Sequence, residues 1–301
     1  MIDLDALTRA WWRAVGRRVD LAGTEAWLVA PMSPSSVVDG RWQDESAAAV
    51  GGTLAASDPD AGLLADMSSL DGPGFAAARL HPAVRDFYEH TSNWQMEVWS
   101  AWHWWAKPGG ELVARLFGRR VQQLALPTHP LDVAHGMDSS VTVVQDAEGV
   151  QRAAIWLRTL RRTGGTVYSG QYSVRTLPGV DRPSVHVAFP LQDGNVQVFL
   201  RPGVGEDGSL VLESPPAATR RAFGTEGAYV TVRGRGHAYA AAVPVVEHFR
   251  VYVDERGALR CDHRLRLWSA TALRLHYKLD RSETQGCEDQ SARQGRQVPS
   301  P

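Results

Sequence analysis

The chain has 301 residues, and its 32 lysines and arginines balance 33 aspartates and glutamates for a formal net charge of −1. This length predicts one large domain, or one domain with an appended helical region. The charge balance argues against nucleic acid as a partner, because phosphate binding requires a basic surface. With only two cysteines, the sequence has neither a disulfide framework nor a thiolate metal cluster, which indicates a reducing compartment.

The N-terminus and the hydropathy of the chain bear on localisation. Residues 1–5 lack the basic and apolar segments of a signal peptide. No apolar run reaches the roughly 18 residues needed to span a bilayer. We therefore expect a soluble, cytoplasmic protein.

Residues 1–80 combine an amphipathic helix with an irregular connector. The connector, from residue 19 onward, is rich in glycine, proline, serine and aspartate and has no long periodic run. The helix, over residues 3–18, has arginines between apolar positions and is expected to dock on the core. Its apolar positions recur at helical spacing: Leu4, Leu7, Trp11, Trp12 and Val15.

Residues 81–127 predict a tryptophan-rich pair of helices. His81 is suited to cap the first helix, Pro82 to occupy its first position, and apolar residues then recur every three or four positions. A second apolar stripe runs from Leu112 to Leu124. The first helix holds a cluster of tryptophans: Trp94, Trp99, Trp102, Trp104 and Trp105.

These tryptophans have two predicted roles. Trp94, Trp102 and Trp105 fit a stripe that packs on the core. Trp99 and Trp104 lie off that stripe, so they are expected to line a ligand entrance or to make a peripheral membrane contact. The absence of a polybasic cluster in the sequence weakens the membrane alternative.

After residue 139 the hydrophobic period changes from 3.6 to 2, which predicts strands. No helical pattern separates them, so the sheet is antiparallel, and so many strands favour closure or strong curling over open edges. We predict an α+β fold, with a barrel or curled sheet of about ten strands over 128–280 that is lipocalin-like by analogy, and a disordered tail over 281–301. The expected strands are 140–146, 150–160, 165–177, 184–190, 195–201, 209–213, 227–233, 236–241, 243–254, 258–268 and 271–279.

Several short runs resemble the bacterial YndJ-like proteins and their soluble actinobacterial relatives. The resemblance covers about residues 81–279 and implies no established activity or catalytic residue. Some relatives join this region to membrane-spanning segments, which would imply work near lipid, but this chain lacks such segments. The matching runs are His81-Pro82 with 86–91, 119–124, 262–268 and 273–277.

Alternation along the C-terminal strands assigns three polar residues to an otherwise apolar face. Glu247 shares a face with Phe249, and His263 and Tyr277 share faces with leucines. Three-residue loops at 255–257 and 269–271 would place Phe249 opposite His263, Glu247 diagonal to it, and Tyr277 opposite it. The three side chains could then meet inside the barrel as a catalytic acid–base group, as a head-group recognition site or as a structural hydrogen-bond cluster.

A weaker pattern places potential metal ligands every three residues between the helices and the sheet. These ligands are His129, Asp132, His135 and Asp138. Pro130 and Gly136 disrupt a regular helix there, so the spacing does not put the ligands on one face. A polar loop is favoured, and no metal or cofactor is predicted.

These observations favour a protein that binds a hydrophobic small molecule, such as a lipid, isoprenoid or polyketide, in a barrel capped by the tryptophan-rich helix. Two alternatives remain: a cofactor-independent cyclase, isomerase or lyase using Glu247, His263 and Tyr277, and a structural or interaction module. The expected ligand contacts are Trp99, Trp102, Trp104, Trp105 and Phe249.

Overall fold

The structure is a computed structural model that describes residues 4–34, 41–103, 105, 137–161, 164, 166–215 and 223–282. The helices are α1 (Leu4–Val15), α2 (Arg41–Ala49) and α3 (Pro82–Glu89), with 3₁₀ turns at Ala26–Leu28, Met67–Leu70, Ala77–Arg79 and Thr91–Asn93. The strands are β1 (Arg17–Val19), β2 (Thr53–Leu54), β3 (Trp94–Trp102), β4 (Met137–Gln145), β5 (Gln151–Leu160), β6 (Thr166–Thr176), β7 (Pro183–Leu191), β8 (Gly194–Val204), β9 (Leu210–Glu213), β10 (Gly227–Arg233), β11 (Ala238–Val243), β12 (Val245–Val253), β13 (Leu259–Leu267) and β14 (Ala270–Arg281).

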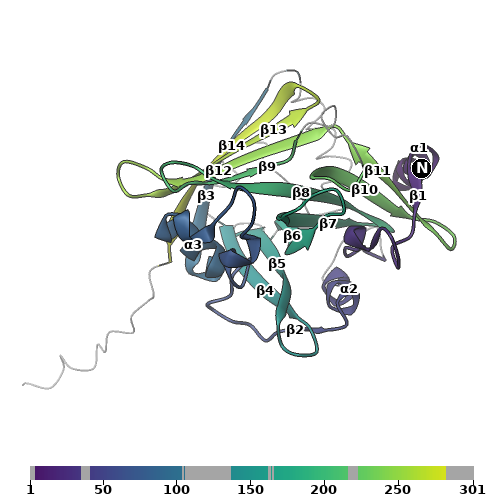
Figure 1. Ribbon diagram of the computed structural model, residues 1–301, viewed down its shortest axis with the longest axis horizontal. Helices are drawn as coiled ribbons and strands as arrows, with labels where there is room; N and C mark the ends of the chain where they lie inside the picture. The colour runs from purple at the N-terminus through teal and green to yellow at the C-terminus, as the bar shows by residue number, and fades with distance from the viewer. Residues whose placement is uncertain are drawn as a thin grey trace, which may run out of the picture.

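All strands belong to one 14-stranded sheet that curls strongly (Figure 1). Its main path runs β2-β4-β5-β6-β7-β8-β9-β12-β13-β14-β3. The long strand β8 is the branch point, because its first half pairs with β10 and its second half with β9. The strands β3 and β4 approach each other but form no ladder among the described residues, so the sheet is curled and not closed.

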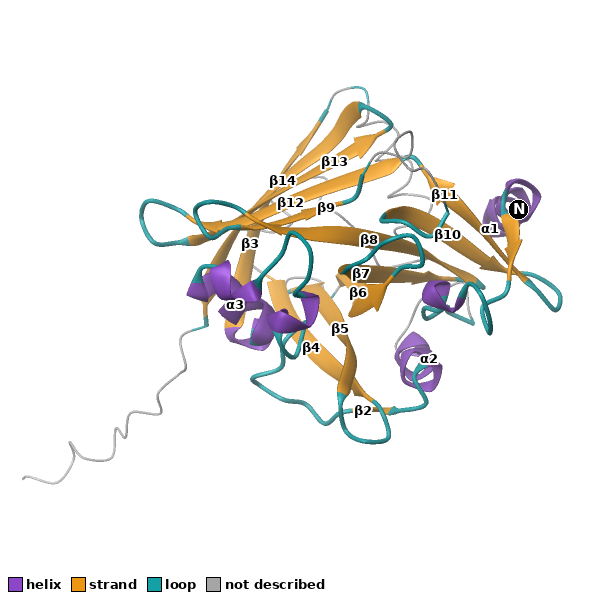
Figure 2. Cartoon of the chain, viewed as in Figure 1, coloured by secondary structure: helices purple, strands orange, loops and turns teal. Residues whose placement is uncertain are grey.

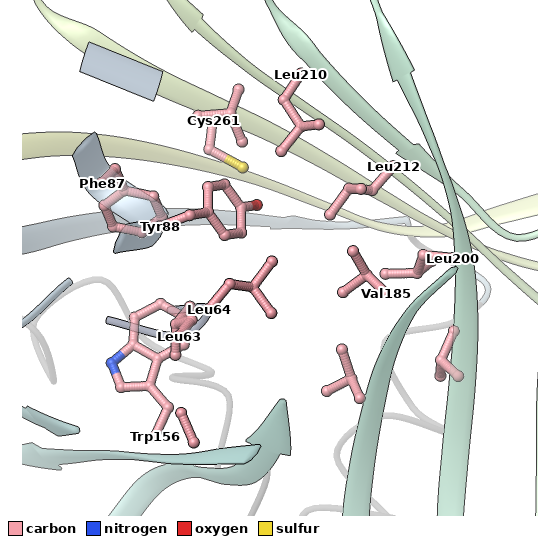
Figure 3. Packing of buried hydrophobic residues seen from close by; sticks show 14 of the residues in the cluster. Leu63, Leu64, Phe87, Tyr88, Trp156, Val185, Leu200, Leu210, Leu212 and Cys261 are labelled. Atoms are coloured by element: carbon pink, nitrogen blue, oxygen red, sulfur yellow. The ribbon is translucent and has the colours of Figure 1, made fainter. Parts of the chain in front are cut away.

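The inner face of the curled sheet carries the main hydrophobic core. Residues 61–93, which include α3, lie against this face and contribute Leu63, Phe87 and Tyr88 to the core. Figure 3 shows Tyr88 lying between Cys261 of β13 and Trp156 of β5, which come from the two wings of the sheet. This segment therefore holds the two wings together.

The N-terminal connector packs on the outer face of the central strands. Trp27 contacts the rings of Phe199 and Tyr229 edge-on, with centroids 5.3 and 5.2 Å apart. The buried Gln197 side chain donates to the backbone carbonyl of Leu28 at 2.8 Å. The Asn195 side chain likewise donates to the carbonyl of Ala30 at 3.1 Å, so buried side-chain amides satisfy backbone carbonyls of this part of the connector that no strand or long helix pairs.

The remaining helices lie at the sides of the sheet (Figure 2). Helix α2, which the connector pattern did not predict, buries Trp42 against Ile155 on the outer face of β5. Helix α1 confirms the amphipathic helix expected near the N-terminus and contacts β10 and β11, but Leu7, Trp11 and Val15 of its apolar stripe are exposed and do not dock on the core as predicted. Within the described ranges, no helix has the length and apolar character needed to cross a bilayer.

The structure confirms every strand predicted after residue 139. It also confirms the start of the first predicted helix, where His81 is the cap and Pro82 the first residue, but not the extension of that helix through the tryptophans. Helix α3 ends at Glu89, and Trp94–Trp102 is the strand β3, paired with β14. The apolar positions Trp94, Val98 and Trp102 are four residues apart, a spacing that fits a helix and also one face of a strand. The second predicted helix, residue Trp104 and most of the predicted tail lie outside the described residues.

Candidate functional site

The candidate site lies on the inner face of strands β12, β13 and β14. Strand β12 pairs with β13 so that Phe249 lies opposite His263, as the loop length predicted. The loop closes by a backbone hydrogen bond from Asp254 to Ala258, and Gly257 adopts a positive φ of 78° that suits a residue without Cβ. This tight loop fixes which residues of the two strands face inward.

Glu247 and His263 approach each other on this face. The Nε2 atom of His263 lies 3.7 Å from Oε2 of Glu247, and the two side chains are only 11% and 14% exposed. The His263 ring stacks on Phe249 with centroids 3.8 Å apart. Neither ring nitrogen of His263 has a hydrogen-bond partner among the described residues. The pair is therefore oriented by stacking, and a small movement would bring the two groups into hydrogen-bond range.

Tyr277 lies on the same face but not opposite His263 as predicted. It pairs with Cys261, and His263 pairs with Leu275. The predicted three-residue loop is instead a two-residue turn at Trp268 and Ser269. In addition, the pairing shifts by one residue between Leu265 and Arg266. The slip is two residues, so the inward orientation of Tyr277 is kept, and burial raises the pKa of its phenol.

Arg158 of β5 is a further charged residue on the inner face that the sequence reasoning missed. Its guanidinium lies 4.6 Å from the ring centre of Trp156, 4.3 Å from that of Tyr168 and 5.9 Å from that of Tyr277. Only 7% of Arg158 is exposed. The signal was present in the sequence, because Arg158 follows Ala154 and Trp156 at alternate positions of an apolar face.

Two tyrosines of β6 complete the polar part of this face. The hydroxyl of Tyr168 donates to that of Tyr172 at 2.9 Å. Burial raises the pKa of Tyr172 to about 12, although the hydrogen bond from Tyr168 and the charge of Arg158 act against this increase. Burial also raises the pKa of Tyr168, so both hydroxyls are protonated at neutral pH. Tyr168 donates to Tyr172, and the O–H of Tyr172 can donate to a ligand. We call Arg158, Tyr168, Tyr172, Glu247, His263 and Tyr277 the inner polar cluster.

The structure places some of the predicted ligand contacts on the inner face of the sheet and others at exposed positions. Phe249 faces inward, and Trp102 is half-buried with an indole N–H that has no partner in the described part of the chain. Trp99 is 50% exposed and lies on the outer face of β3, beside the ring of His276. Trp105 is also exposed. The expectation that Trp99 lines a ligand entrance does not hold for the inner face.

The metal pattern gains no support from the described residues. His129, Asp132 and His135 lie outside them, and Asp138 forms an ion pair with Arg161 at 2.7 Å. No group of three potential metal ligands occurs within the ranges that the structure describes.

Comparison with known proteins gives one informative similarity. No family model and no solved structure matches the chain. Over 218 residues, or 72% of its length, the chain is 27% identical to the uncharacterized membrane protein YndJ of Bacillus subtilis (strain 168). The matched region covers 38% of YndJ, so the chain spans well under half of that relative. The sequence comparison thus supports the resemblance to YndJ-like proteins, but this relative has no established activity to compare.

Proposed function

We propose that the inner face of the curled sheet binds a hydrophobic small molecule, such as a lipid, isoprenoid or polyketide. The observation that carries this proposal is that four of the seven buried polar atoms without partners among the described residues lie on one apolar face. These four are Arg158 Nε, both ring nitrogens of His263 and the indole nitrogen of Trp102. A buried polar atom without a partner costs about 1 to 3 kcal/mol, so native proteins keep few of them. A ligand with an apolar body and a few polar groups would satisfy these atoms.

Two further features support this proposal. Phe249, Tyr168 and Trp156 give the face aromatic surface that suits an apolar ligand. Lipocalins provide the analogy, since their curled antiparallel sheets hold hydrophobic ligands. The proposal no longer includes a capping helix, because Trp94–Trp102 is a strand.

Titration with oleyl alcohol, followed by tryptophan fluorescence, tests this proposal. Phe249→Ala should weaken binding by about tenfold, because it removes an inward-facing ring and the support of His263. Trp99→Ala, on the outer face of the same sheet, is the matched control and should leave affinity unchanged. Equal affinities for both variants and the wild type would place any binding elsewhere, and no binding at all would favour the structural or interaction module.

An enzyme is the second candidate function, and the distance between Glu247 and His263 favours it. A carboxylate and an imidazole 3.7 Å apart, both mostly buried, can act as an acid–base pair in which one of the two groups exchanges a proton with a substrate beside them. A cyclase, isomerase or lyase on an apolar substrate needs such an acid–base pair and a shaped enclosure. Tyr277, held protonated by burial, would act as a hydrogen-bond donor in that reaction.

Peripheral membrane contact stays a prediction, and we infer that α1 is better placed for it than the tryptophans of β3. Leu7, Trp11 and Val15 form one face of α1 and are 55%, 61% and 48% exposed. The arginines of α1 lie on the opposite side of the helix, where Arg9 donates to Gln192 and Arg13 to the backbone carbonyl of Arg233, so the inference rests on the exposed apolar face alone.

Sedimentation with phosphatidylglycerol vesicles measures this contact. Trp11→Ser should reduce the bound fraction severalfold, since it removes the largest exposed apolar side chain of α1. Trp99→Ser removes a tryptophan of the sheet that is 50% exposed and should have no effect. If Trp99→Ser alone reduced the bound fraction, the membrane contact would lie on β3 and the inference for α1 would be wrong.

A further inference from the structure

Arg158 is a buried cation without a counter-ion in contact. No aspartate or glutamate oxygen lies within 4.0 Å of its guanidinium among the described residues. Glu247, the carboxylate of the same face, is next to His263 instead. A guanidinium stays charged in proteins, and a buried charge without a partner is strongly destabilising. The fold therefore keeps at this position a charge that its own described side chains do not neutralise by contact.

The surroundings of Arg158 leave its in-plane donors for a ligand. The rings of Trp156 and Tyr168 lie 4.6 and 4.3 Å from its central carbon, which is the range of cation–π contact. In the plane, Nη1 donates to the sulfur of Met96 at 2.9 Å, and sulfur is a weak acceptor. The Nε atom is buried and has no partner in the described part of the chain. An oxygen acceptor at this edge is what the arrangement lacks.

We propose that Arg158 binds the carboxylate of an amphiphilic ligand whose apolar body lies along the inner face. This inference rests on the proposed function and specifies its ligand class. A planar carboxylate matches the parallel N–H donors of a guanidinium edge and would neutralise the buried charge. The hydroxyl of Tyr168 donates to that of Tyr172 at 2.9 Å, so the O–H of Tyr172 is the further donor that this face can offer to the carboxylate.

The test compares oleate with oleyl alcohol, which share the same chain and differ in the charged head group. Calorimetric titration of the wild type should show oleate binding about 10 to 100 times more tightly, the range for a hydrogen bond to a charged group. Arg158→Gln should remove that preference and leave the affinity for oleyl alcohol within about twofold. Arg161→Gln, which alters a half-exposed arginine just beyond the same strand, is the matched control and should keep the preference.

The outcomes separate this inference from the proposed function. If the alcohol binds and oleate binds no more tightly, the role of Arg158 is wrong and the hydrophobic site stands. If neither compound binds the wild type, both are wrong. The comparison of the two compounds on the wild type decides the question even where Arg158→Gln does not fold.

Discussion

Trp156→Ala should lower the free energy of unfolding by about 3 to 5 kcal/mol, the cost of truncating a core aromatic side chain. Trp156 is 6% exposed and contacts the rings of Phe87 and Tyr168. Its indole N–H also donates to the hydroxyl of Ser139 at 2.8 Å. The truncation thus leaves a cavity where α3 meets β5, and it removes one of the rings beside Arg158.

Urea unfolding followed by circular dichroism measures this effect, and Trp99→Ala provides the comparison. Trp99 is half-exposed, so its truncation should change the free energy of unfolding by less than about 1 kcal/mol. Similar losses for the two variants would mean that the inner face is not the main core of the protein.

Acidification below pH 6.5 should destabilise the protein through His186, a fully buried residue on the outer face of β7. Burial, together with the nearby charge of Arg175, lowers the pKa of His186 to about 3. Its ring nitrogens lie 2.9 Å from the Ser173 hydroxyl and 2.9 Å from Oε1 of Gln197, which suits the neutral imidazole. Because the Gln197 amide nitrogen donates to Leu28, its oxygen is the acceptor from His186.

The direction of the pH dependence follows from proton uptake. Between pH 6.5 and about 3 the unfolded state binds a proton at His186 that the folded state does not. The stability is therefore complete above pH 6.5 and falls by at most about 1.4 kcal/mol per pH unit below it. His186→Gln removes this titration, so its unfolding free energy should change less between pH 7 and 5 than that of the wild type. His237→Gln, at an exposed position, should keep the wild-type dependence, and parallel profiles for all three proteins would contradict the assignment.

The register of β12 and β13 was predictable because it depends on local features. Residues 255–257 form a short loop ending in glycine, and alternation on both sides assigns the faces, so the Phe249–His263 pair followed from counting. The predicted register of the next hairpin, β13 with β14, was wrong because Trp268 adopts a positive φ of 52°. A tryptophan rarely adopts this conformation, and no sequence pattern signals it. The placement of Tyr277 was wrong by two residues for that reason.

Strand β3 shows a second limit of sequence patterns. A four-residue spacing of Trp94, Val98 and Trp102 fits both periods, and the pairing partner that decides between them, β14, lies more than 170 positions away in the sequence. The high β-propensity of tryptophan and valine was the signal that favoured the strand. Tertiary pairing determined the result.

The approach of Arg158 to Tyr277 within the inner polar cluster depends on how the whole sheet curls. Alternation could assign Arg158 to an apolar face of β5, but its approach to Tyr277 requires β5 and β14 to lie across the same interior. That arrangement follows from the branch at β8 and from the packing of residues 61–93 between the wings. Neither is a local property of the sequence.

The position of a bound ligand tests the central claim most directly. Photolabelling with a diazirine derivative of oleyl alcohol, followed by peptide mass spectrometry, identifies the residues that the ligand contacts. We expect label on inward-facing residues such as Met96, Tyr168 and Phe249, and its loss on competition with unlabelled oleyl alcohol. Competable label confined to outward-facing residues such as Trp11 and Trp99 would contradict an inner-face binding site.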